Sequence, residues 1–291
     1  EYIKKVGTPI VVKADGLAAG KGVILAQTDD EAITAVKDML AGNAFGDAGH
    51  RVVVEEFLYG EEASYICMVD GYNILPMATS QDHKARDNGD TGPNTGGMGA
   101  YSPAPVVTDE IAERVMQEVI RPTVDGMAQE GVPYTGFLYA GLMIDSKGTP
   151  KVLEYNCRFG DPETQPIMMR LDSDLVSHCL AALEGNLDQQ KTLWNPKFSL
   201  GVVLAAKGYP DQYSKGESIK SIPPETLDTK VFHAGTRLDA ENNVVSNGGR
   251  VLCAVALGDS VKQAQEQAYK LVNEIDWPGS YFRTDIGFKA L

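Results

Sequence analysis

Residues 9–26 read PIVVKADGLAAGKGVILA, and this stretch predicts a β-hairpin whose turn is rich in glycine. The apolar run 9–12 is typical of a strand, and residues 23–26 resume a strand after the loop. Backbone N–H groups in such a loop can approach phosphate oxygens, while Lys13 and Lys21 bring positive charge from either side. The pattern is not a P-loop, because Lys21 is followed by Gly22 and not by Ser or Thr. The stretch indicates a polyphosphate site, and a plain hairpin with two solvated lysines is the alternative.

The composition is that of an ordinary globular protein, with 43% hydrophobic and 23% charged residues among 291. A net charge of −14 argues against a nucleic-acid surface, which needs clustered basic residues, although a local pocket can still bind a small anion. The sequence has no apolar run of about 18 residues, so we expect neither a membrane span nor a membrane partner. The four cysteines lack CxxC spacing, and we expect buried, reduced thiols in a cytoplasmic protein. They are Cys67, Cys157, Cys179 and Cys253.

The periodicity of apolar residues predicts both helices and strands, arranged as an α/β or α+β fold with mostly antiparallel hairpins. Helices are expected at 28–42, 109–129, 173–184 and after Ser260, and strands at 51–57, 63–69, 73–79, 135–144, 151–156, 199–206, 230–235 and 250–257. Residues 82–105 contain almost no apolar side chains and predict a long irregular segment, which in a compact domain carries function or is mobile. The polar stretch 185–197 predicts a boundary before a second unit.

Chemistry is concentrated in LEYNCRFGDPETQP, residues 153–166. Side chains alternate along a strand, so Glu154 and Asn156 are expected on one face, about 6.6 Å apart along the strand. Two oxygen ligands on one face suit Mg²⁺, which takes one or two carboxylates together with nucleotide phosphates. Arg158 would reach a phosphate if the alternation continued. For the E-x-N triplet alone, a solvated strand end is the simpler interpretation, and the neighbouring motifs favour the metal.

Four stretches together resemble the glycinamide ribonucleotide synthetase family, also called phosphoribosylamine–glycine ligase, a branch of the ATP-grasp superfamily. They are VVKADGLAAGKGV at 11–23, VVVEEFLYGEEAS at 52–64, DHK at 82–84 followed by GPNTGGMGAYSPAP at 92–105, and EYNCRFGDPETQP at 154–166. HAGT at 233–236, NGGRVL at 247–252 and DIG at 285–287 resemble the C-terminal part of the same family. The resemblance spans essentially the whole chain.

The resemblance implies an ATP-grasp domain at 1–190, with a small lobe at about 1–57 and a large lobe at about 58–190, and a smaller C-terminal α+β domain at 191–291. It also implies the reaction. ATP phosphorylates the carboxylate of glycine, and the amine of 5-phosphoribosylamine attacks the glycyl phosphate, giving glycinamide ribonucleotide, ADP and phosphate in purine synthesis. Phosphoryl transfer to a carboxylate depends mainly on positioning and charge neutralisation.

The resemblance places ATP on residues from two of the motifs. The phosphates would lie against Lys13 and the glycine loop, and the backbone near Glu55 would read the adenine edge, while Glu62 would accept hydrogen bonds from the ribose. The complete expected set is Lys13, Gly16, Gly20, Lys21, Gly22, Glu55, Glu56, Phe57, Leu58 and Glu62. Glu154 and Asn156 are the implied ligands of Mg²⁺, with Mn²⁺ as an alternative ion, and Arg158 would stabilise the transferring phosphoryl group.

The resemblance also implies a site for phosphoribosylamine and glycine. Asp161 and Glu163 would hold the ammonium group of glycine or the sugar amine, or they could be turn and cap residues around Pro162. The remaining expected substrate residues are Asp82, His83, Lys84, Asn94, Thr95, Gly96, Gly97 and Met98. His83 could instead be a structural hydrogen-bond partner. Arg250 could bind phosphate, although an arginine after a turn at a strand start is more often solvated.

The sequence departs from the family pattern in two places. The strand LYAGLMI offers no second carboxylate for a metal, which leaves the number of ions open, and Ala85 stands where the family has an arginine after the lysine. The family also has an N-terminal domain that we expect to be absent from these residues. Two alternatives follow: a nucleotide-binding fragment without full activity, or a sister carboxylate–amine ligase of purine synthesis. A module of a larger multifunctional chain is a further possibility. We expect a monomer that binds small molecules.

Overall fold

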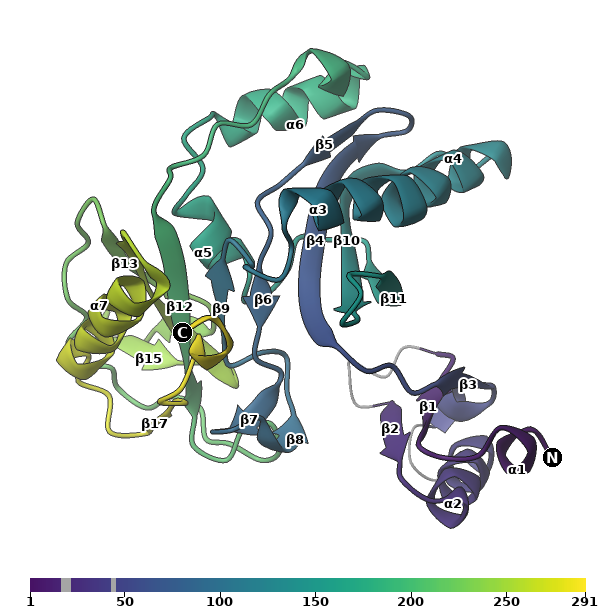
Figure 1. The fold of residues 1–291 in the computed structure, drawn as a ribbon. Coiled ribbons are helices and arrows are strands. Elements are labelled where there is room, and N and C mark those ends of the chain that lie inside the picture. The colour runs from purple at the N-terminus through teal and green to yellow at the C-terminus, as the bar shows by residue number, and fades with distance from the viewer. Residues whose placement is uncertain (17–21, 43–45) are drawn as a thin grey trace. The chain divides into compact units, whose positions relative to one another are not determined.

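The computed structural model describes residues 1–16, 22–42 and 46–291, and the chain divides into two compact units, 1–59 and 60–291 (Figure 1). The predicted site residues Gly20 and Lys21 lie outside the described residues. Among the described residues, no helix combines the length and the apolar character needed to cross a membrane.

The first unit is a three-stranded antiparallel sheet with a helix packed on it. The strand order is β2–β1–β3, with β1 at Ile10–Ala14, β2 at Val23–Ala26 and β3 at Val52–Glu56. Helix α2 spans Asp29–Leu40 and begins with the predicted capping box, in which the Glu31 N–H and the Thr28 hydroxyl are paired. Buried side chains of α2 pack against β1 and form the core of this unit. The remaining elements are α1 at Tyr2–Val6 and the 3₁₀ turn η1 at Gly46–Gly49.

The second unit contains a four-stranded antiparallel sheet of order β11–β10–β4–β5, with helices on both faces (Figure 1). The strands are β4 at Glu61–Asp70, β5 at Ile74–Pro76, β10 at Thr135–Ile144 and β11 at Pro150–Asn156. Side chains of β4 alternate, so Tyr65, Cys67 and Val69 pack under one helical layer and Ile66 and Met68 under the other. The first layer is α3 (Asp109–Val115), the π turn η2 (Met116–Ile120) and α4 (Arg121–Gln129); the second includes α5 (Thr164–Met168), α6 (Leu175–Glu184) and η3 (Leu187–Gln189).

A second antiparallel sheet of this unit has the order β13–β16–β12–β9–β6, and β17 also pairs with β12. Helix α7, at Val261–Glu274, packs on this sheet, and its Ser260 cap accepts from the Gln263 N–H as predicted. The strands are β6 at Gln81–Asp82, β9 at Gly99–Ser102, β12 at Phe198–Ala206, β13 at Thr229–His233, β16 at Arg250–Gly258 and β17 at Ser280–Tyr281. Two small hairpins, β7 (Ala85–Asp87) with β8 (Thr91–Asn94) and β14 (Thr236–Leu238) with β15 (Val244–Ser246), and the 3₁₀ turn η4 (Phe288–Ala290) complete it.

The prediction of a long irregular segment at 82–105 is wrong, since strands β6 to β9 occupy much of it. Strand β9 is fully buried and pairs with β12, although its residues are Gly, Ala, Tyr and Ser. A Cβ on Gly99 would lie 2.6 Å from the Gly201 carbonyl oxygen, so small residues here permit close strand contact and are not a sign of a loop. Sheet pairing therefore joins residues on both sides of the predicted boundary at 190/191.

The cysteine prediction is only partly correct. All four thiols are free, and Cys67 and Cys253 are buried, but Cys179 is half-buried and Cys157 is exposed. Cys157 follows the last residue of β11, where the chain has left the sheet and its core.

Candidate active site

Lys84 lies in the second unit among carboxylates that come from separate segments. Its Nζ atom is 2.7 Å from Oε2 of Glu62, at the start of β4. Burial opposes the charged form of Lys84, but the charges of Asp82, Glu62 and Glu154 raise its pKa above the ordinary value. Burial raises the pKa of Asp82 to about 7, and the charges of Glu163 and Glu62 act in the same direction while Lys84 opposes them. The arrangement provides one fixed cation and several carboxylates, one of which exchanges its proton near neutral pH.

Hydroxyl groups of the four-stranded sheet hold Glu163 in place. Its side chain is buried, and its Oε1 accepts a hydrogen bond of 2.9 Å from the Ser64 hydroxyl. That hydroxyl is 3.0 Å from the hydroxyl oxygen of Tyr139 on β10, and burial raises the pKa of Tyr139. A Cβ on Gly160 would lie 2.6 Å from Oε2 of Glu163, so the preceding turn passes close to the carboxylate. Sequence reasoning missed Ser64 and Tyr139, because Tyr139 belongs to a strand without a motif and Ser64 ends a motif whose expected role is nucleotide binding, with no local sign of its bond to Glu163.

Glu154 and Asn156 share one face at the end of β11, as the alternation predicts. The Asn156 Nδ2 donates to Glu154 Oε1 at 3.3 Å. Gly141 lies opposite Glu154 on β10, where a Cβ would lie 3.3 Å from Cγ of Glu154, and Glu154 is exposed. Among the described residues, no group of three or more His, Cys, Asp and Glu side chains could hold a metal. Two oxygen donors on an exposed face fit a magnesium ion that completes its shell with phosphate oxygens and water.

The strand alternation does not continue to Arg158. Strand β11 ends at Asn156, and the Arg158 guanidinium donates to the Phe159 carbonyl at 2.9 Å. Arg158 is exposed, so its side chain is accessible to an anion.

Residues 94–98, the proposed substrate loop, are bonded to the segment that carries Lys84. The N–H and hydroxyl of Thr95 donate to the Lys84 carbonyl at 2.7 and 2.9 Å, and the Met98 N–H donates to the His83 carbonyl at 2.8 Å. Asn94 ends β8 and is exposed, whereas Met98 is fully buried. The structure thus brings residues 94–98 next to the DHK motif.

Arg250 connects the substrate loop to Asp161. Its Nη1 donates to the Gly96 carbonyl at 2.6 Å and to the Asp161 carbonyl at 2.8 Å, and its Nη2 is 2.9 Å from Asp161 Oδ2. The expectation that Arg250 is solvated is wrong, because long-range packing of β16 against these two segments supplies acceptors that the local sequence does not show.

The ring of His83 is fully buried and lies in a different place from the side chain of Lys84. It packs edge-on between the rings of Tyr101 and Phe288, with centroids 5.8 and 5.7 Å away. Its Nε2 accepts from the Gly287 N–H at 3.2 Å, and within the described part of the chain its Nδ1 has no partner. Burial lowers the pKa of His83 to about 4, and the charge of Arg283 adds to the effect. The ring is therefore neutral at pH 7 and has the structural contacts that the alternative interpretation describes.

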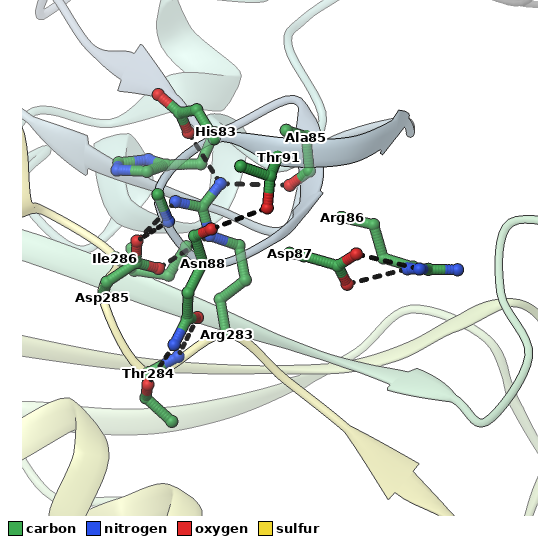
Figure 2. A network of polar contacts seen from close by, with 12 residues as sticks. His83, Ala85, Arg86, Asp87, Asn88, Thr91, Arg283, Thr284, Asp285 and Ile286 are labelled. Carbon is green, nitrogen blue, oxygen red and sulfur yellow. Dashed lines mark hydrogen bonds and ion pairs between the residues drawn. The ribbon is translucent and has the colours of Figure 1, made fainter.

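The β7–β8 hairpin, which leads into the substrate loop, is fastened to the C-terminal segment by Arg283 (Figure 2). The buried guanidinium forms two bonds of 2.8 Å to the Asp285 carboxylate, one of 2.8 Å to Asp90 and one of 3.0 Å to the Ala85 carbonyl. Asn88 adds hydrogen bonds to Thr284. Because these bonds satisfy a fully buried cation, they fix the hairpin.

In the first unit, the Lys13 Nζ lies 2.5 Å from Oε2 of Glu55. Gly16 donates its N–H to the Ala48 carbonyl, and a Cβ there would lie 2.6 Å from the Ala48 Cα, so only glycine fits. The Gly22 carbonyl accepts from the Ala14 N–H at the other end of the loop. Strand β3 ends at Glu56, and the two next predicted nucleotide residues, Phe57 and Leu58, are half-buried. The structure thus brings Lys13 and Glu55 together on one small sheet.

Comparison with known proteins finds one family over most of the chain. The family model described as "Phosphoribosylglycinamide synthetase, ATP-grasp (A) domain" matches residues 1–164, and "Phosphoribosylglycinamide synthetase, C domain" matches residues 199–289. The chain is 67% identical to a phosphoribosylamine–glycine ligase of Vibrio vulnificus and 65% identical to one of Salmonella typhimurium. Each match covers 100% of this chain and 68% of the relative.

Solved structures give a matching result. The crystal structure of phosphoribosylamine–glycine ligase from Thermotoga maritima has a TM-score of 0.90 and 37% identity, covering 98% of this chain and 71% of that one. The biotin carboxylase domain of a Hydrogenobacter thermophilus 2-oxoglutarate carboxylase, in complex with MgADP, has a TM-score of 0.72 at 16% identity and covers 97% and 60%. The second likeness concerns the fold alone.

Proposed function

Because this chain belongs to the phosphoribosylglycinamide synthetase family, we infer that it performs the reaction for which its relatives are named. It is an ATP-dependent carbon–nitrogen ligase of purine biosynthesis that joins glycine to 5-phosphoribosylamine. Its fold is the α+β fold of ATP-grasp enzymes followed by a C-terminal domain. We propose that the ATP-grasp domain spans 1–190, with lobes at about 1–57 and 58–190, and that the C-terminal domain spans 191–291.

The chemistry has two steps. A carboxylate oxygen of glycine attacks the γ-phosphorus of ATP, ADP leaves, and glycyl phosphate forms. The amine nitrogen of 5-phosphoribosylamine then attacks the acyl carbon, phosphate leaves, and the nitrogen loses a proton. Both steps gain most from fixed charges and from alignment of the reactants, since neither requires a covalent bond to the protein.

We assign the nucleotide to residues of the motifs at 11–23 and 52–64. Lys13, Gly16 and Gly22 would lie at the phosphates, together with Gly20 and Lys21, and Glu55 to Leu58 would read the base. The pairing of Lys13 with Glu55 supports this assignment, because it brings residues of the two nucleotide motifs together on one sheet. For Glu62 the bond to Lys84 leaves one carboxylate oxygen for a ribose hydroxyl.

ATP-grasp enzymes bind ATP together with Mg²⁺, and Glu154 with Asn156 would hold the ion here. An exposed carboxylate beside an amide fits the donor set of Mg²⁺ and also that of Mn²⁺. When bound, the ion neutralises charge on the phosphate oxygens. Arg158 would add a second positive group there, and the exposure of its guanidinium supports that role.

The single observation that carries the substrate assignment is the convergence of Lys84, the substrate loop and the turn 160–163 in one unit. Lys84 would face the anionic substrate, and the carboxylates of Asp82, Asp161 and Glu163 would hold the glycine ammonium or the sugar amine. Residues Asn94 to Met98 would form the loop around the sugar phosphate. His83 would act only through its backbone, because its ring is buried.

We further propose a cytoplasmic monomer whose partners are its small-molecule substrates, with no nucleic-acid or membrane surface. The charge of −14 supports this by disfavouring binding to polyanions.

The test is phosphate release from Mg·ATP with glycine and freshly generated 5-phosphoribosylamine, each omitted in turn. Release that requires both substrates supports the ligase. Nucleotide binding without any substrate-dependent release, from protein shown to be folded, would favour a nucleotide-binding fragment and contradict the proposal.

A further inference from the structure

Arg250 lies at the first position of β16 and forms hydrogen bonds to acceptors on two segments that are remote in sequence. Its Nη1 contacts the carbonyl oxygens of Gly96, Gly97 and Asp161 at 2.6, 3.4 and 2.8 Å, and its Nη2 contacts Asp161 Oδ2 at 2.9 Å. The Arg250 side chain is only 19% exposed. A planar guanidinium can bridge several oxygens in fixed directions, which a lysine ammonium cannot reproduce.

The glycines of the substrate loop are fitted to this contact. A Cβ on Gly96 would lie 2.8 Å from Cζ of Arg250, and a Cβ on Gly97 would lie 2.4 Å from Cδ of Pro162. Gly97 also has a φ of +113°, which other residues rarely adopt. The Gly-Gly pair thus allows the backbone of the substrate loop to lie directly against Arg250 and the 160–163 turn.

Tyr209 also supports this loop. The Gly96 N–H donates to the Tyr209 hydroxyl at 2.9 Å. A Cβ on Gly249, the residue before Arg250, would lie 2.4 Å from Cδ2 of Tyr209, so the tyrosine packs on the chain that carries the arginine. The N–H and the carbonyl of Gly96 are therefore both bonded to side chains of the C-terminal sequence, which fixes the orientation of the backbone there.

We propose that Arg250 is a positioning residue of the ligase, which holds the substrate loop and Asp161 in one fixed relative arrangement before the substrates bind. The proposal rests on the proposed assignment of 94–98 and Asp161 to the substrates. In this way the C-terminal domain contributes to catalysis indirectly, through the position of residues that contact the substrates. Four acceptors surround the Arg250 guanidinium, so its effect on the reaction passes through the groups that it holds.

Loss of the Arg250 contacts should misalign the bound substrates. Displacement of reacting groups by about 1 Å can reduce a rate by about 100-fold. Arg250→Ala should therefore lower kcat/KM for 5-phosphoribosylamine by about 10- to 100-fold, while the Kd for Mg·ATP changes by less than about twofold because no proposed nucleotide group contacts Arg250. Arg250→Lys should recover only part of the loss.

The experiment compares Arg250→Ala and Arg250→Lys with Arg114→Ala. Arg114 is a matched control, since it also pairs with a carboxylate, Glu118, and donates to a carbonyl, that of Gly148, but lies on α3. Kinetic constants are measured for each substrate at a temperature where all variants are folded, and added ethylguanidinium tests for recovery of the alanine variant. Partial recovery supports positioning by a guanidinium, and a simple loss of folding stability would not produce it.

Hydrogen exchange separates failure of this inference from failure of the assigned function. Faster exchange of the amides of 95–98 in Arg250→Ala, but not in Arg114→Ala, is expected whether or not the loop binds substrate. If exchange quickens while kcat/KM stays at the wild-type value, the assignment of the loop to substrate is wrong. If both the exchange of 95–98 and the kinetic constants match those of wild type, Arg250 has no positioning role and the inference is overturned.

Discussion

Lys84 and Glu62 form an ion pair with 2.7 Å between Nζ and Oε2, which links the DHK segment to the start of β4. The pair joins a residue proposed for the sugar substrate to one proposed for the ribose of ATP. Because Asp82 and Glu154 also act on Lys84, this lysine balances the carboxylates of the proposed substrate site.

Removal of that cation should weaken the binding of anionic substrates and disturb the nearby carboxylates. We expect Lys84→Met to lower kcat/KM for 5-phosphoribosylamine by about 100-fold, in the range seen when a preorganised charge is removed from an active site. Lys147→Met, on the exposed β10–β11 turn, removes one positive charge elsewhere and should change kcat/KM little. Equal kinetic constants for the two variants would rule out a substrate role for Lys84.

The pKa of Asp82 predicts how stability depends on pH. Burial raises this pKa from 3.8 to about 7, so between these values the folded chain holds a proton that the unfolded chain has released. The contribution of Asp82 to the free energy of unfolding therefore falls as pH rises from about 4 to 7 and stays low above that. Asp82→Asn removes the charge, and its Tm relative to wild type should increase between pH 4 and pH 8. A Tm difference that is constant over this range would show that Asp82 is not perturbed.

Arg283 should be far more important for stability than the half-buried Arg86 nearby. Its buried guanidinium neutralises Asp285 and Asp90, so Arg283→Met leaves two carboxylates without their main partner. We expect a loss of about 3 kcal/mol in the free energy of unfolding, at the lower end for a broken buried pair since Lys289 still contacts Asp90.

The control for this prediction is Arg86→Met, whose pair with Asp87 on the β7–β8 hairpin is half-buried, whereas the Arg283 side chain is fully buried. It should shift the urea midpoint much less than Arg283→Met, because water still reaches this pair and screens its charges. Tryptophan fluorescence reports the transition, as Trp277 is buried in the core on which this segment packs. Similar midpoints for the two variants would mean that the Arg283 network does not hold the C-terminal segment.

The proposed metal ligands predict a change in magnesium dependence. Glu154→Gln keeps the shape of the side chain and loses its charge, so the Mg²⁺ concentration for half-maximal activity should rise by about tenfold or more. Glu118→Gln, in an exposed pair with Arg114, is the control for losing a carboxylate. Activity is measured for both variants over a Mg²⁺ titration. An unchanged midpoint for Glu154→Gln would place the ion elsewhere.

Local patterns in the sequence predicted local features of the fold well. The cap of α2 depends on Thr28 and Glu31, which are three residues apart, and the shared face of Glu154 and Asn156 follows from strand alternation. Both are set by backbone geometry within one element, so one sequence contains all the information that they require.

Features set by long-range pairing could not be predicted in the same way. Strand β9 is buried because β12 pairs with it, and its small residues carry no hydrophobic pattern. Arg250 resembles a solvated arginine until β16 lies beside Gly96 and Asp161, and Ser64 has no sign of its bond to Glu163, which is 99 residues away. In each case the partner is supplied by tertiary packing.

The most direct test of the ligase account uses glycine labelled with ¹⁸O in its carboxylate, with unlabelled ATP and 5-phosphoribosylamine. If the carboxylate attacks the γ-phosphorus and the amine then displaces phosphate, each phosphate released carries one ¹⁸O, in a one-to-one ratio with glycinamide ribonucleotide. Phosphate without label, formed alongside the product or in its absence, would contradict the glycyl phosphate route and with it the assignment of this site.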